Sequence, residues 1–298
     1  MKNQSRRDFL KKSTMGALGA ALLSQYGLAA CAQGAKSNGS GIGIQLYTVR
    51  NSMNADLLGT LKTVADTGYQ YLELAGYENG KFYGYSPKEF KKIVADLGME
   101  IISSHTGVEV KGVDTSNVNI IAEAHAELGV KYCVQPWMIE ERRESADSYR
   151  EFVEELNIIG EVMKQYGVQF GYHNHDFEFF ETDGLIPYTD IFLPETDPEL
   201  VVFEIDNYWV KRAGFDPKEV MKQFPGRFDL WHIKDMDNTP DQFFAPVGEG
   251  IIDYKEIFKV KDVAGMKYFF VEMDDTRDGD EIGVIKTSFK NLKNDILI

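Results

Sequence analysis

The stretch Phe170-Gly171-Tyr172-His173-Asn174-His175-Asp176-Phe177-Glu178 decides the fold, because an apolar β-type run passes directly into a cluster of imidazole, amide and carboxylate groups. Three later apolar runs end in the same way, at residues 201–206, 230–235 and 268–274. The carboxyl ends of parallel strands meet at one edge of a barrel or sheet, where active sites lie. The four runs therefore predict parallel strands that share one site, and we expect the chain to be an enzyme.

Apolar β-rich runs alternate with amphipathic runs from residue 42 to residue 298. The expected strands span residues 42–47, 71–74, 100–104, 131–135, 169–173, 201–205, 229–233 and 268–271. The expected helices span residues 56–67, 87–97, 118–128, 147–166, 217–224, 254–260 and 281–292. This alternation over about 250 residues is typical of a single-domain α/β fold, the (β/α)8 TIM barrel. An open doubly wound sheet is the alternative, but it needs a Gly-rich phosphate turn that residues 42–50 lack.

The first 41 residues are expected to lie outside the barrel. Arg6-Arg7 precedes a short apolar stretch, and Leu28-Ala29-Ala30-Cys31 has the pattern of a bacterial lipobox. Residues 1–31 thus resemble a twin-arginine signal peptide with a lipidation cysteine, and residues 32–41 a flexible linker. The alternative is a chance basic helix with an incidental cysteine. We expect an exported, periplasmic lipoprotein that contacts the membrane only through a lipid anchor at Cys31.

The chain is acidic, with a formal net charge of −15. Removal of residues 1–30, which carry five basic residues and one acidic residue, lowers this charge to −19. Such a charge repels phosphate backbones, so we expect no nucleic-acid partner. Cys133 lies in an apolar run without a second cysteine to pair with once Cys31 carries lipid, and it is expected in the core.

Five runs lie at or near the ends of the predicted strands: residues 171–179, Glu204-Ile205-Asp206, His232-Ile233-Lys234-Asp235, residues 247–250 and residues 271–274. Together they resemble the xylose-isomerase-like barrel superfamily, in its sugar phosphate isomerase/epimerase and inosose-dehydratase-like branch. The resemblance implies a divalent cation, Mn, Co, Zn or Mg, held by groups that end strands five to eight. Carried over by position, the metal ligands are His173, Asp206, His232 and Glu272.

His173 departs from the family pattern, in which a carboxylate is usual at this position. A neutral imidazole still binds transition metals, and the lower ligand charge makes the ion a stronger Lewis acid. One carboxylate base beside a polarised carbonyl suffices for enolisation and for β-elimination. Two reactions therefore stay open on an unphosphorylated sugar, polyol or keto-glycoside. One is isomerisation or epimerisation; the other is the lyase or dehydratase reaction on a keto-sugar such as an inosose or 3-keto-glycoside.

Residues two apart on a strand share a face, which extends the set of candidate catalytic residues. Glu272 is expected to be the base, and Lys234 to donate a hydrogen bond to an ene-diolate, with a salt bridge to Glu204 or Glu249 as its alternative role. His175 and Glu204 complete the predicted catalytic group, although His175 could instead orient a metal ligand.

Other strand ends are predicted to contact a small carbohydrate substrate. They place Gln45, Tyr47, Glu73, His105, Trp137 and Trp209 at the same mouth, and Phe243-Phe244 lies in a long loop that could cover it. Core packing is the alternative for the aromatic residues, and a turn-capping role is the alternative for His105. A non-catalytic carbohydrate-binding lipoprotein, a metal-dependent nuclease of the same barrel type and a homo-oligomer also stay open at this stage.

Overall fold

Eight parallel strands close into a barrel. In order around its wall they are β1 (Gly43–Gln45), β12 (Tyr268–Val271), β9 (Leu230–Ile233), β8 (Val201–Asp206), β7 (Gln169–His173), β6 (Tyr132–Gln135), β5 (Glu100–His105) and β2 (Tyr71–Leu74). The computed structural model describes residues 41–106 and 113–297, so the predicted signal peptide lies outside the described residues. The predicted single-domain TIM barrel is confirmed.

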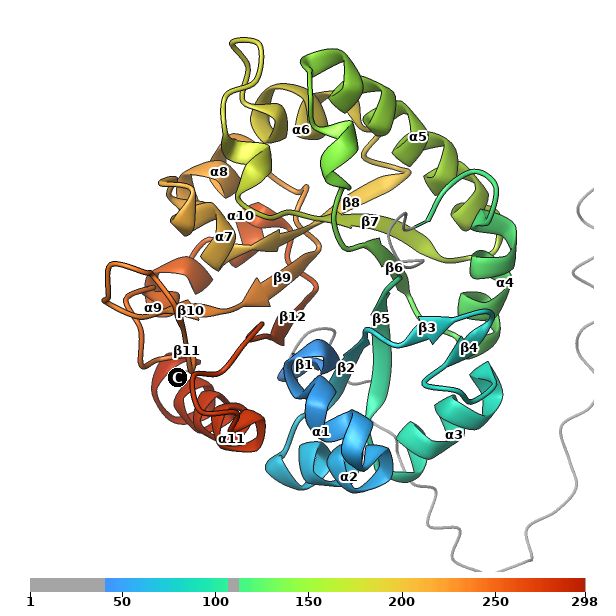
Figure 1. Ribbon diagram of the computed structural model, residues 1–298, viewed down its shortest axis with the longest axis vertical. Helices are drawn as coiled ribbons and strands as arrows, with labels where there is room; N and C mark the ends of the chain where they lie inside the picture. The colour runs from blue at the N-terminus through green and yellow to red at the C-terminus, as the bar shows by residue number, and fades with distance from the viewer. Residues whose placement is uncertain (1–40, 107–112, 298) are drawn as a thin grey trace, which may run out of the picture. The chain divides into compact units, whose positions relative to one another are not determined.

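Helices form the outer layer around these strands (Figure 1). They are α1 (Arg50–Ala55), α2 (Leu57–Thr67), α3 (Pro87–Asp96), α4 (Val118–Leu128), α5 (Ala146–Gln165), α6 (Leu193–Glu195), α7 (Asn207–Arg212), α8 (Pro217–Gln223), α9 (Tyr254–Phe258), α10 (Lys261–Ala264) and α11 (Glu281–Asn291). No helix within the described ranges is long and apolar enough to cross a membrane.

Capping residues in the sequence set several helix ends. The Ser86 side chain accepts the backbone N–H of Glu89, and the Glu89 carboxylate accepts that of Ser86, which makes a capping box with Pro87 at the first helical position. Helix α2 ends at Gly68 with φ of 114°, a left-handed conformation that favours glycine. Because these signals are local, the bounds of α2 and α3 match the sequence prediction closely.

The first strand is shorter than predicted. It ends at Gln45, and residues 46–49 form a 3₁₀ helix instead of continuing to Tyr47. The Gln45 side chain accepts the backbone N–H of Tyr47 at 3.0 Å, which turns the chain out of the strand. The predicted long loop after strand seven also contains two short strands, β10 (Asp235–Met236) and β11 (Phe244–Ala245), which pair antiparallel.

The barrel interior has an apolar layer beneath a polar one. Alternating strand positions supply the apolar cluster Tyr71, Ile102, Tyr132, Val134, Val202, Leu230, Tyr268 and Phe270. Two residues further along β8 and β9 the inward positions are Glu204 and His232, and Asp206 follows at the end of β8. The inner face therefore changes from apolar to polar toward the carboxyl ends of the strands, where TIM barrels carry their sites.

Two buried polar side chains support the outer layer. Glu281, at the start of α11, accepts four hydrogen bonds from the backbone and side chains of Asn51 and Ser52 on α1. His125 on α4 lies 2.7 Å from the Ile121 carbonyl oxygen through Nδ1 and 2.7 Å from the Thr106 hydroxyl through Nε2. Burial lowers the pKa of His125 to about 4, so this imidazole is neutral in the fold.

Candidate functional site

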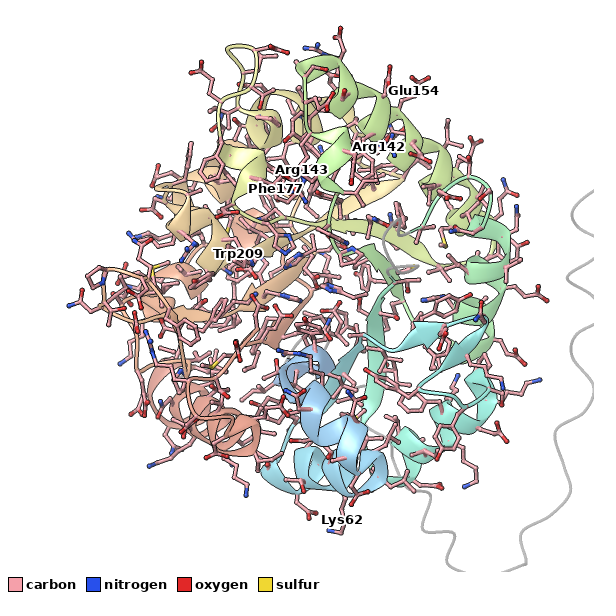
Figure 2. The ribbon with its side chains drawn as sticks, viewed as in Figure 1. Lys62, Arg142, Arg143, Glu154, Phe177 and Trp209 are labelled. Carbon is pink, nitrogen blue, oxygen red and sulfur yellow. The ribbon has the colours of Figure 1, made fainter. Side chains whose placement is uncertain are left out.

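A pocket of about 560 Å³ opens at the carboxyl ends of the strands. Its lining residues are Tyr47, Ala75, His105, Pro136, Trp137, His173, His175, Trp209, Phe244, Glu272 and Asp274. Six of the predicted substrate or catalytic positions are among them: Tyr47, His105, Trp137, His175, Trp209 and Glu272. Trp209 projects from α7 and is labelled in Figure 2. The pocket thus combines titratable groups with aromatic side chains.

The four predicted metal ligands converge beside this pocket. One donor atom from each of His173, Asp206, His232 and Glu272 lies within 4.8 Å of the other three, and all four side chains are buried. The His173 Nε2 atom lies 3.3 Å from Asp206 Oδ2, and His232 Nδ1 lies 2.8 Å from Glu272 Oε2. We call these four residues the first ligand set. Two imidazoles and two carboxylates from neighbouring strand ends are a donor set that fits a divalent transition metal.

Lys234 lies among the carboxylates of the first ligand set. Its Nζ atom is 2.9 Å from Asp206 Oδ2, 2.7 Å from Glu272 Oε2, and 2.9 and 3.0 Å from the two oxygens of Asp274. The salt bridge that the sequence suggested for Lys234 therefore exists, but its partners are these three residues and not Glu204 or Glu249.

The buried charges shift the pKa values of the site in opposite directions. Burial would raise the pKa of Asp206 and of Glu272, but Lys234 and the nearby histidines lower both well below their usual values. Burial would lower the pKa of Lys234, but Asp206, Asp274 and Glu272 raise it well above the usual value. The lysine is therefore an ammonium, and the two carboxylates are ionised. For Asp274, burial outweighs Lys234 and raises the pKa to about 6.

A second cluster, Glu73, His105 and Glu204, adjoins the first; its two carboxylates are buried and His105 is partly exposed, and we call it the inner set. The Nε2 atom of His232 lies 2.7 Å from Glu73 Oε2 and 3.2 Å from Glu204 Oε2, while His105 Nε2 lies 3.5 Å from Glu73 Oε2. Burial raises the pKa of Glu73 and of Glu204. Three strands, β2, β5 and β8, supply this set.

Four of the predicted contact and catalytic residues are buried and do not line the pocket: Gln45, Glu73, Glu204 and Lys234. Gln45 is buried and donates to Glu73 Oε2 at 3.0 Å, because its strand ends early and its side chain turns inward. Glu73 and Glu204 are fully buried in the inner set. Asp274, which the sequence placed only on the face of Glu272, lines the pocket instead.

His175 belongs to the wall of the pocket formed after β7. Its backbone N–H donates to Glu178 Oε2 at 2.9 Å, and Tyr172 donates its hydroxyl to the other oxygen of Glu178 at 2.7 Å. The ring lies 5.3 Å from that of Trp209, and its buried Nδ1 atom has no hydrogen-bond partner among the described residues. Burial and His173 lower the pKa of His175 well below its usual value. This wall presents a neutral imidazole to the pocket.

The mouth of the pocket carries an aromatic rim. Phe244 packs on Tyr208 with ring centres 4.7 Å apart and lies 6.1 Å from Trp209. Phe243 instead packs against Arg277, whose guanidinium carbon lies 4.3 Å from the ring centre, and it does not line the pocket. On the other side, Arg143 lies over Phe177, both labelled in Figure 2. Of the predicted pair, only Phe244 lines the pocket.

Asp235 fixes the loop that carries Phe244. Its two carboxylate oxygens accept four backbone N–H groups, those of Met236, Gly248, Gly250 and Ile252, at 2.8 to 3.1 Å. Gly250 has no room for a side chain, because an added Cβ would lie 2.3 Å from the Asp235 carboxylate. Both ends of residues 236–252 are therefore tied to one buried residue at the start of β10.

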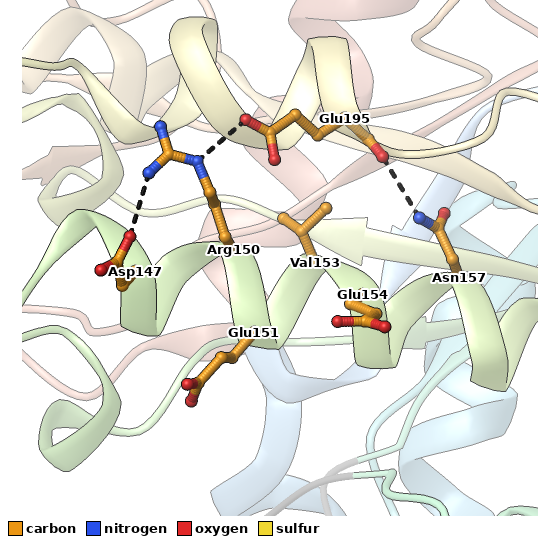
Figure 3. A pocket seen from close by; sticks show the side chains of 7 residues that line it. All are labelled: Asp147, Arg150, Glu151, Val153, Glu154, Asn157 and Glu195. Atoms are coloured by element: carbon orange, nitrogen blue, oxygen red, sulfur yellow. Dashed lines mark hydrogen bonds and ion pairs between the residues drawn. The ribbon is translucent and has the colours of Figure 1, made fainter.

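A second hollow, of about 580 Å³, lies on the outer face of α5 (Figure 3). There Arg150 pairs with Asp147 and Glu195 at 3.2 Å each, and Asn157 donates to the Glu195 carbonyl oxygen. The side chains of Arg150 and Glu195 are about two-fifths exposed. Exposed ion pairs of this kind contribute little to stability, and they offer no desolvated group for catalysis. The candidate site is therefore the pocket in the barrel mouth.

A closed barrel with a pocket of buried acids and bases at the carboxyl ends of its strands defines a TIM-barrel enzyme. The chain belongs to the xylose isomerase-like TIM barrel family, whose model matches residues 61–294.

Individual relatives agree with this assignment. An inosose dehydratase of Geobacillus thermodenitrificans is 25% identical over 236 residues, which are 67% of this chain and 78% of that protein. A solved sugar phosphate isomerase/epimerase from Parabacteroides distasonis is 30% identical, with a TM-score of 0.76 over 88% of this chain and 96% of that one. The IolI protein, solved with a bound zinc atom, shares the fold at 16% identity, with a TM-score of 0.67 over 86% of this chain and 99% of that one. The chain is accordingly an enzyme of the sugar isomerase/epimerase or dehydratase type.

Proposed function

We propose that this enzyme uses a divalent metal to enolise an unphosphorylated keto-sugar, keto-polyol or 3-keto-glycoside and then eliminates a β-hydroxyl group or an aglycone. The observation that carries the proposal is the difference between two walls of the pocket. Glu272 and Asp274 follow β12, whereas His173 and His175 end β7, and both pairs line the pocket. Chemically different groups on the two walls suit a reaction in which removal of the proton and departure of the leaving group need different partners.

The first ligand set is the proposed metal site. Its two imidazole nitrogens favour Mn, Co or Zn over Mg, which prefers oxygen ligands. A divalent cation there would polarise the substrate carbonyl group and make the adjacent C–H more acidic. The zinc atom in the IolI structure shows that a barrel of this fold can bind a transition metal, which supports the proposal.

We assign the base to Asp274 and revise the sequence-based choice of Glu272. Glu272 contacts both His232 and Lys234 and belongs to the first ligand set, whereas Asp274 lines the pocket outside that set. In the elimination, Asp274 takes the proton from the carbon next to the carbonyl, the electron pair forms the double bond, and the β C–O bond breaks. His175, on the opposite wall, is placed to hydrogen-bond the leaving oxygen. The leaving oxygen takes up one proton, equal to the one that Asp274 removes, and departs as water or as the aglycone alcohol, so no other reactant is needed.

The charges around the pocket support an unphosphorylated substrate. Among the described residues that line it, none is an arginine or a lysine, while Glu272 and Asp274 are acidic. A phosphate group would meet these carboxylates without a cationic partner to hold it. The aromatic rings of Trp137, Trp209 and Phe244 offer apolar faces for a sugar ring or an aglycone.

Isomerisation or epimerisation is the second candidate reaction. It is favoured by the same two walls, because Asp274 and His175 could remove and return a proton on opposite faces of one carbon. The isomerase/epimerase description of the Parabacteroides distasonis relative supports it. The relatives described as inosose dehydratases support elimination.

Mass spectrometry separates the two reactions. We would incubate metal-loaded protein in deuterium oxide with ketoses, inososes and 3-keto-glycosides. Elimination gives a product lighter by water or by the aglycone, whereas isomerisation keeps the mass apart from incorporated deuterium. Asp274→Asn is the control and should abolish both signals. A metal-loaded protein that binds these sugars but neither exchanges deuterium nor changes their mass would be a carbohydrate-binding lipoprotein, and the proposal would be wrong.

We propose, from residues 1–31 alone, that the enzyme acts after export. The support is the Arg6-Arg7 pair and the cysteine at position 31. Labelling cells with a radioactive fatty acid should mark the wild-type protein, and Cys31→Ala should remove the label. Equal labelling of both proteins would reject the lipid anchor.

A further inference from the structure

We propose that the buried carboxylate of Glu178 is a positioning residue for His175 and that it works as a proton-dependent clamp on this wall of the pocket. Glu178 is fully buried and does not line the pocket, so it does not touch the substrate itself. Its effect on catalysis rests on the proposed function, in which His175 hydrogen-bonds the leaving oxygen. The reaction proposed above makes no use of Glu178.

Glu178 closes the chain segment that leaves the barrel wall after β7. It lies in the 3₁₀ turn Phe177–Phe179. One of its carboxylate oxygens accepts the Tyr172 hydroxyl from β7, and the other accepts the backbone N–H of His175. The carboxylate therefore ties the residue that carries the imidazole back to the strand. A shift of the His175 backbone would stretch or break one of these two hydrogen bonds.

The His175 ring is held by packing and not by a hydrogen bond at Nδ1. This nitrogen has no hydrogen-bond partner among the described residues. The ring packs on Phe177 at 5.9 Å with 16° between the two planes, and it lies 5.3 Å from Trp209. Phe177 belongs to the same turn as Glu178. Both the backbone of His175 and one ring that packs on it therefore depend on where Glu178 is held.

Titratable groups from four neighbouring segments surround Glu178. They are Tyr172 on β7, Tyr149 on α5, Tyr188 in residues 188–192, and Arg143 directly after residues 140–142. Burial raises the pKa of each of the three tyrosines, so these phenols are neutral near neutral pH. The guanidinium of Arg143 donates to the Met138 carbonyl oxygen and lies over the Phe177 ring. This cation is therefore engaged elsewhere and only partly offsets the charge of Glu178.

Glu178 changes its charge near neutral pH. Burial raises its pKa to about 7, although the hydrogen bonds from Tyr172 and His175 and the charge of Arg143 oppose this rise. Above this pH the carboxylate accepts both hydrogen bonds as an anion, and such bonds are roughly twice as strong as those between neutral groups. Below it, one oxygen carries a proton and becomes a donor, so the Tyr172 hydroxyl has to turn. The hold on His175 is therefore tighter above about pH 7 than below it.

Nuclear magnetic resonance tests the clamp without an activity assay. The chain has five histidines, and His175→Gln assigns the ring signal of His175 by removing it. Burial and His173 keep the pKa of His175 well below its usual value, so the ring stays neutral and its signal reports its surroundings. In Zn²⁺-loaded protein with ¹³C-labelled histidine, we expect this signal to shift with a midpoint at about pH 7. Glu178→Gln should remove this step.

Tyr172→Phe supplies a second variant if Glu178→Gln does not fold. It removes the hydroxyl group that donates to Glu178 and keeps the aromatic ring. A carboxylate that loses a hydrogen-bond donor is protonated more easily, so the midpoint of the His175 signal should move to higher pH. Glu281→Gln is the matched control, because it changes a buried carboxylate that joins two helices of the outer layer. It should leave the midpoint unchanged.

A double-mutant cycle tests whether Glu178 acts through His175. With a keto-sugar that the wild type converts, Glu178→Gln should lower kcat about 10- to 100-fold with little change in KM, because a misplaced His175 affects departure of the leaving group more than binding. In the His175→Gln background, the same substitution should have little further effect on kcat. The wild-type kcat should rise with pH through about pH 7, and Glu178→Gln should lack this part of the rise.

The two readouts separate failure of this inference from failure of the proposed function. A His175 signal without a step near pH 7, or equal losses of kcat from Glu178→Gln with and without His175, would overturn the clamp and leave the proposed function intact. Wild-type protein that converts no keto-sugar while its His175 signal follows the charge of Glu178 would overturn the proposed function and keep Glu178 as the residue that positions His175.

Discussion

The ammonium group of Lys234 lies 2.7 Å from Glu272 Oε2 and 2.9 Å from Asp206 Oδ2, the same two carboxylate oxygens that face His232 and His173 in the first ligand set. The lysine and a divalent cation therefore compete for these oxygens and repel each other. We predict that Lys234→Met tightens metal binding by at least about tenfold. The variant removes the repulsion between the buried ammonium group and the cation, which is worth several kcal/mol at this depth. Competition with a fluorescent chelator measures the affinity.

The control for this experiment is Lys211→Met, which changes an exposed lysine on α7. It should leave the metal affinity unchanged. Weaker binding in Lys234→Met would show instead that the lysine organises the carboxylates for the ion.

Removal of the carboxylate charge at Asp274 and at Glu272 should have different effects on activity and on metal content. Asp274→Asn removes the proposed base but no member of the first ligand set, so we predict a loss of activity of about 10²–10⁴-fold with unchanged metal content. Glu272→Gln should lower both the activity and the metal content. Steady-state kinetics together with elemental analysis measures the two effects. Retention of more than a tenth of the activity in Asp274→Asn would exclude it as the base.

Phe244 and Phe243 form a matched pair for testing the aromatic rim. Phe244 lines the pocket, whereas Phe243 packs against Arg277 outside it. We predict that Phe244→Ala raises KM about tenfold, the cost of about 1.4 kcal/mol of lost contact, with little change in kcat. Phe243→Ala should change neither constant more than about twofold. Equal effects of both substitutions would mean that the rim does not contact substrate.

The buried His125 should make stability depend on pH. Its pKa is about 4 in the fold, below the usual 6.5, so the unfolded chain takes up a proton first as the pH falls. The free energy of unfolding should therefore decrease by about 2–3 kcal/mol between pH 7 and pH 4.5 through this residue. Urea unfolding of the wild type and of His125→Gln at both pH values isolates the contribution of His125 to the pH dependence of stability. Identical pH dependence of the two proteins would contradict it.

Replacement of Glu281 should lower the free energy of unfolding more than replacement of most residues in the helical layer. Its four charge-assisted hydrogen bonds join α11 to α1, and its side chain is buried. We predict that Glu281→Ala lowers the free energy of unfolding by about 2–4 kcal/mol. Glu256→Ala, which removes an exposed ion pair with Lys259, should cost less than about 1 kcal/mol. Urea titration followed by circular dichroism compares the two; similar losses would refute the argument.

The convergence of the first ligand set was predictable because it depends on local features. Strand alternation puts His232 and Lys234 on one face, and parallel strands bring Asp206 and Glu272 to the same end of the barrel. The partners of Lys234 were not predictable, since they depend on side-chain reach across three strands. The inward turn of Gln45 was missed because a strand and a 3₁₀ turn have the same apolar pattern over three residues.

The hairpin of β10 and β11 was missed for a different reason. Residues 235–250 are polar and rich in turn-forming residues, which is typical of an irregular loop. Their order comes from Asp235, whose bonds to Gly248, Gly250 and Ile252 span up to seventeen positions in the sequence. Sequence periodicity carries no signal for contacts at that distance.

The same aspartate has a consequence for catalysis. With both ends of residues 236–252 held by Asp235, the Phe244 side of the entrance is built before any sugar arrives. The conformational entropy of this segment is lost once, when the chain folds, and not again in each catalytic cycle. On this side the pocket entrance is preorganised, so selectivity for the substrate depends on the shape that the entrance already has in the free enzyme.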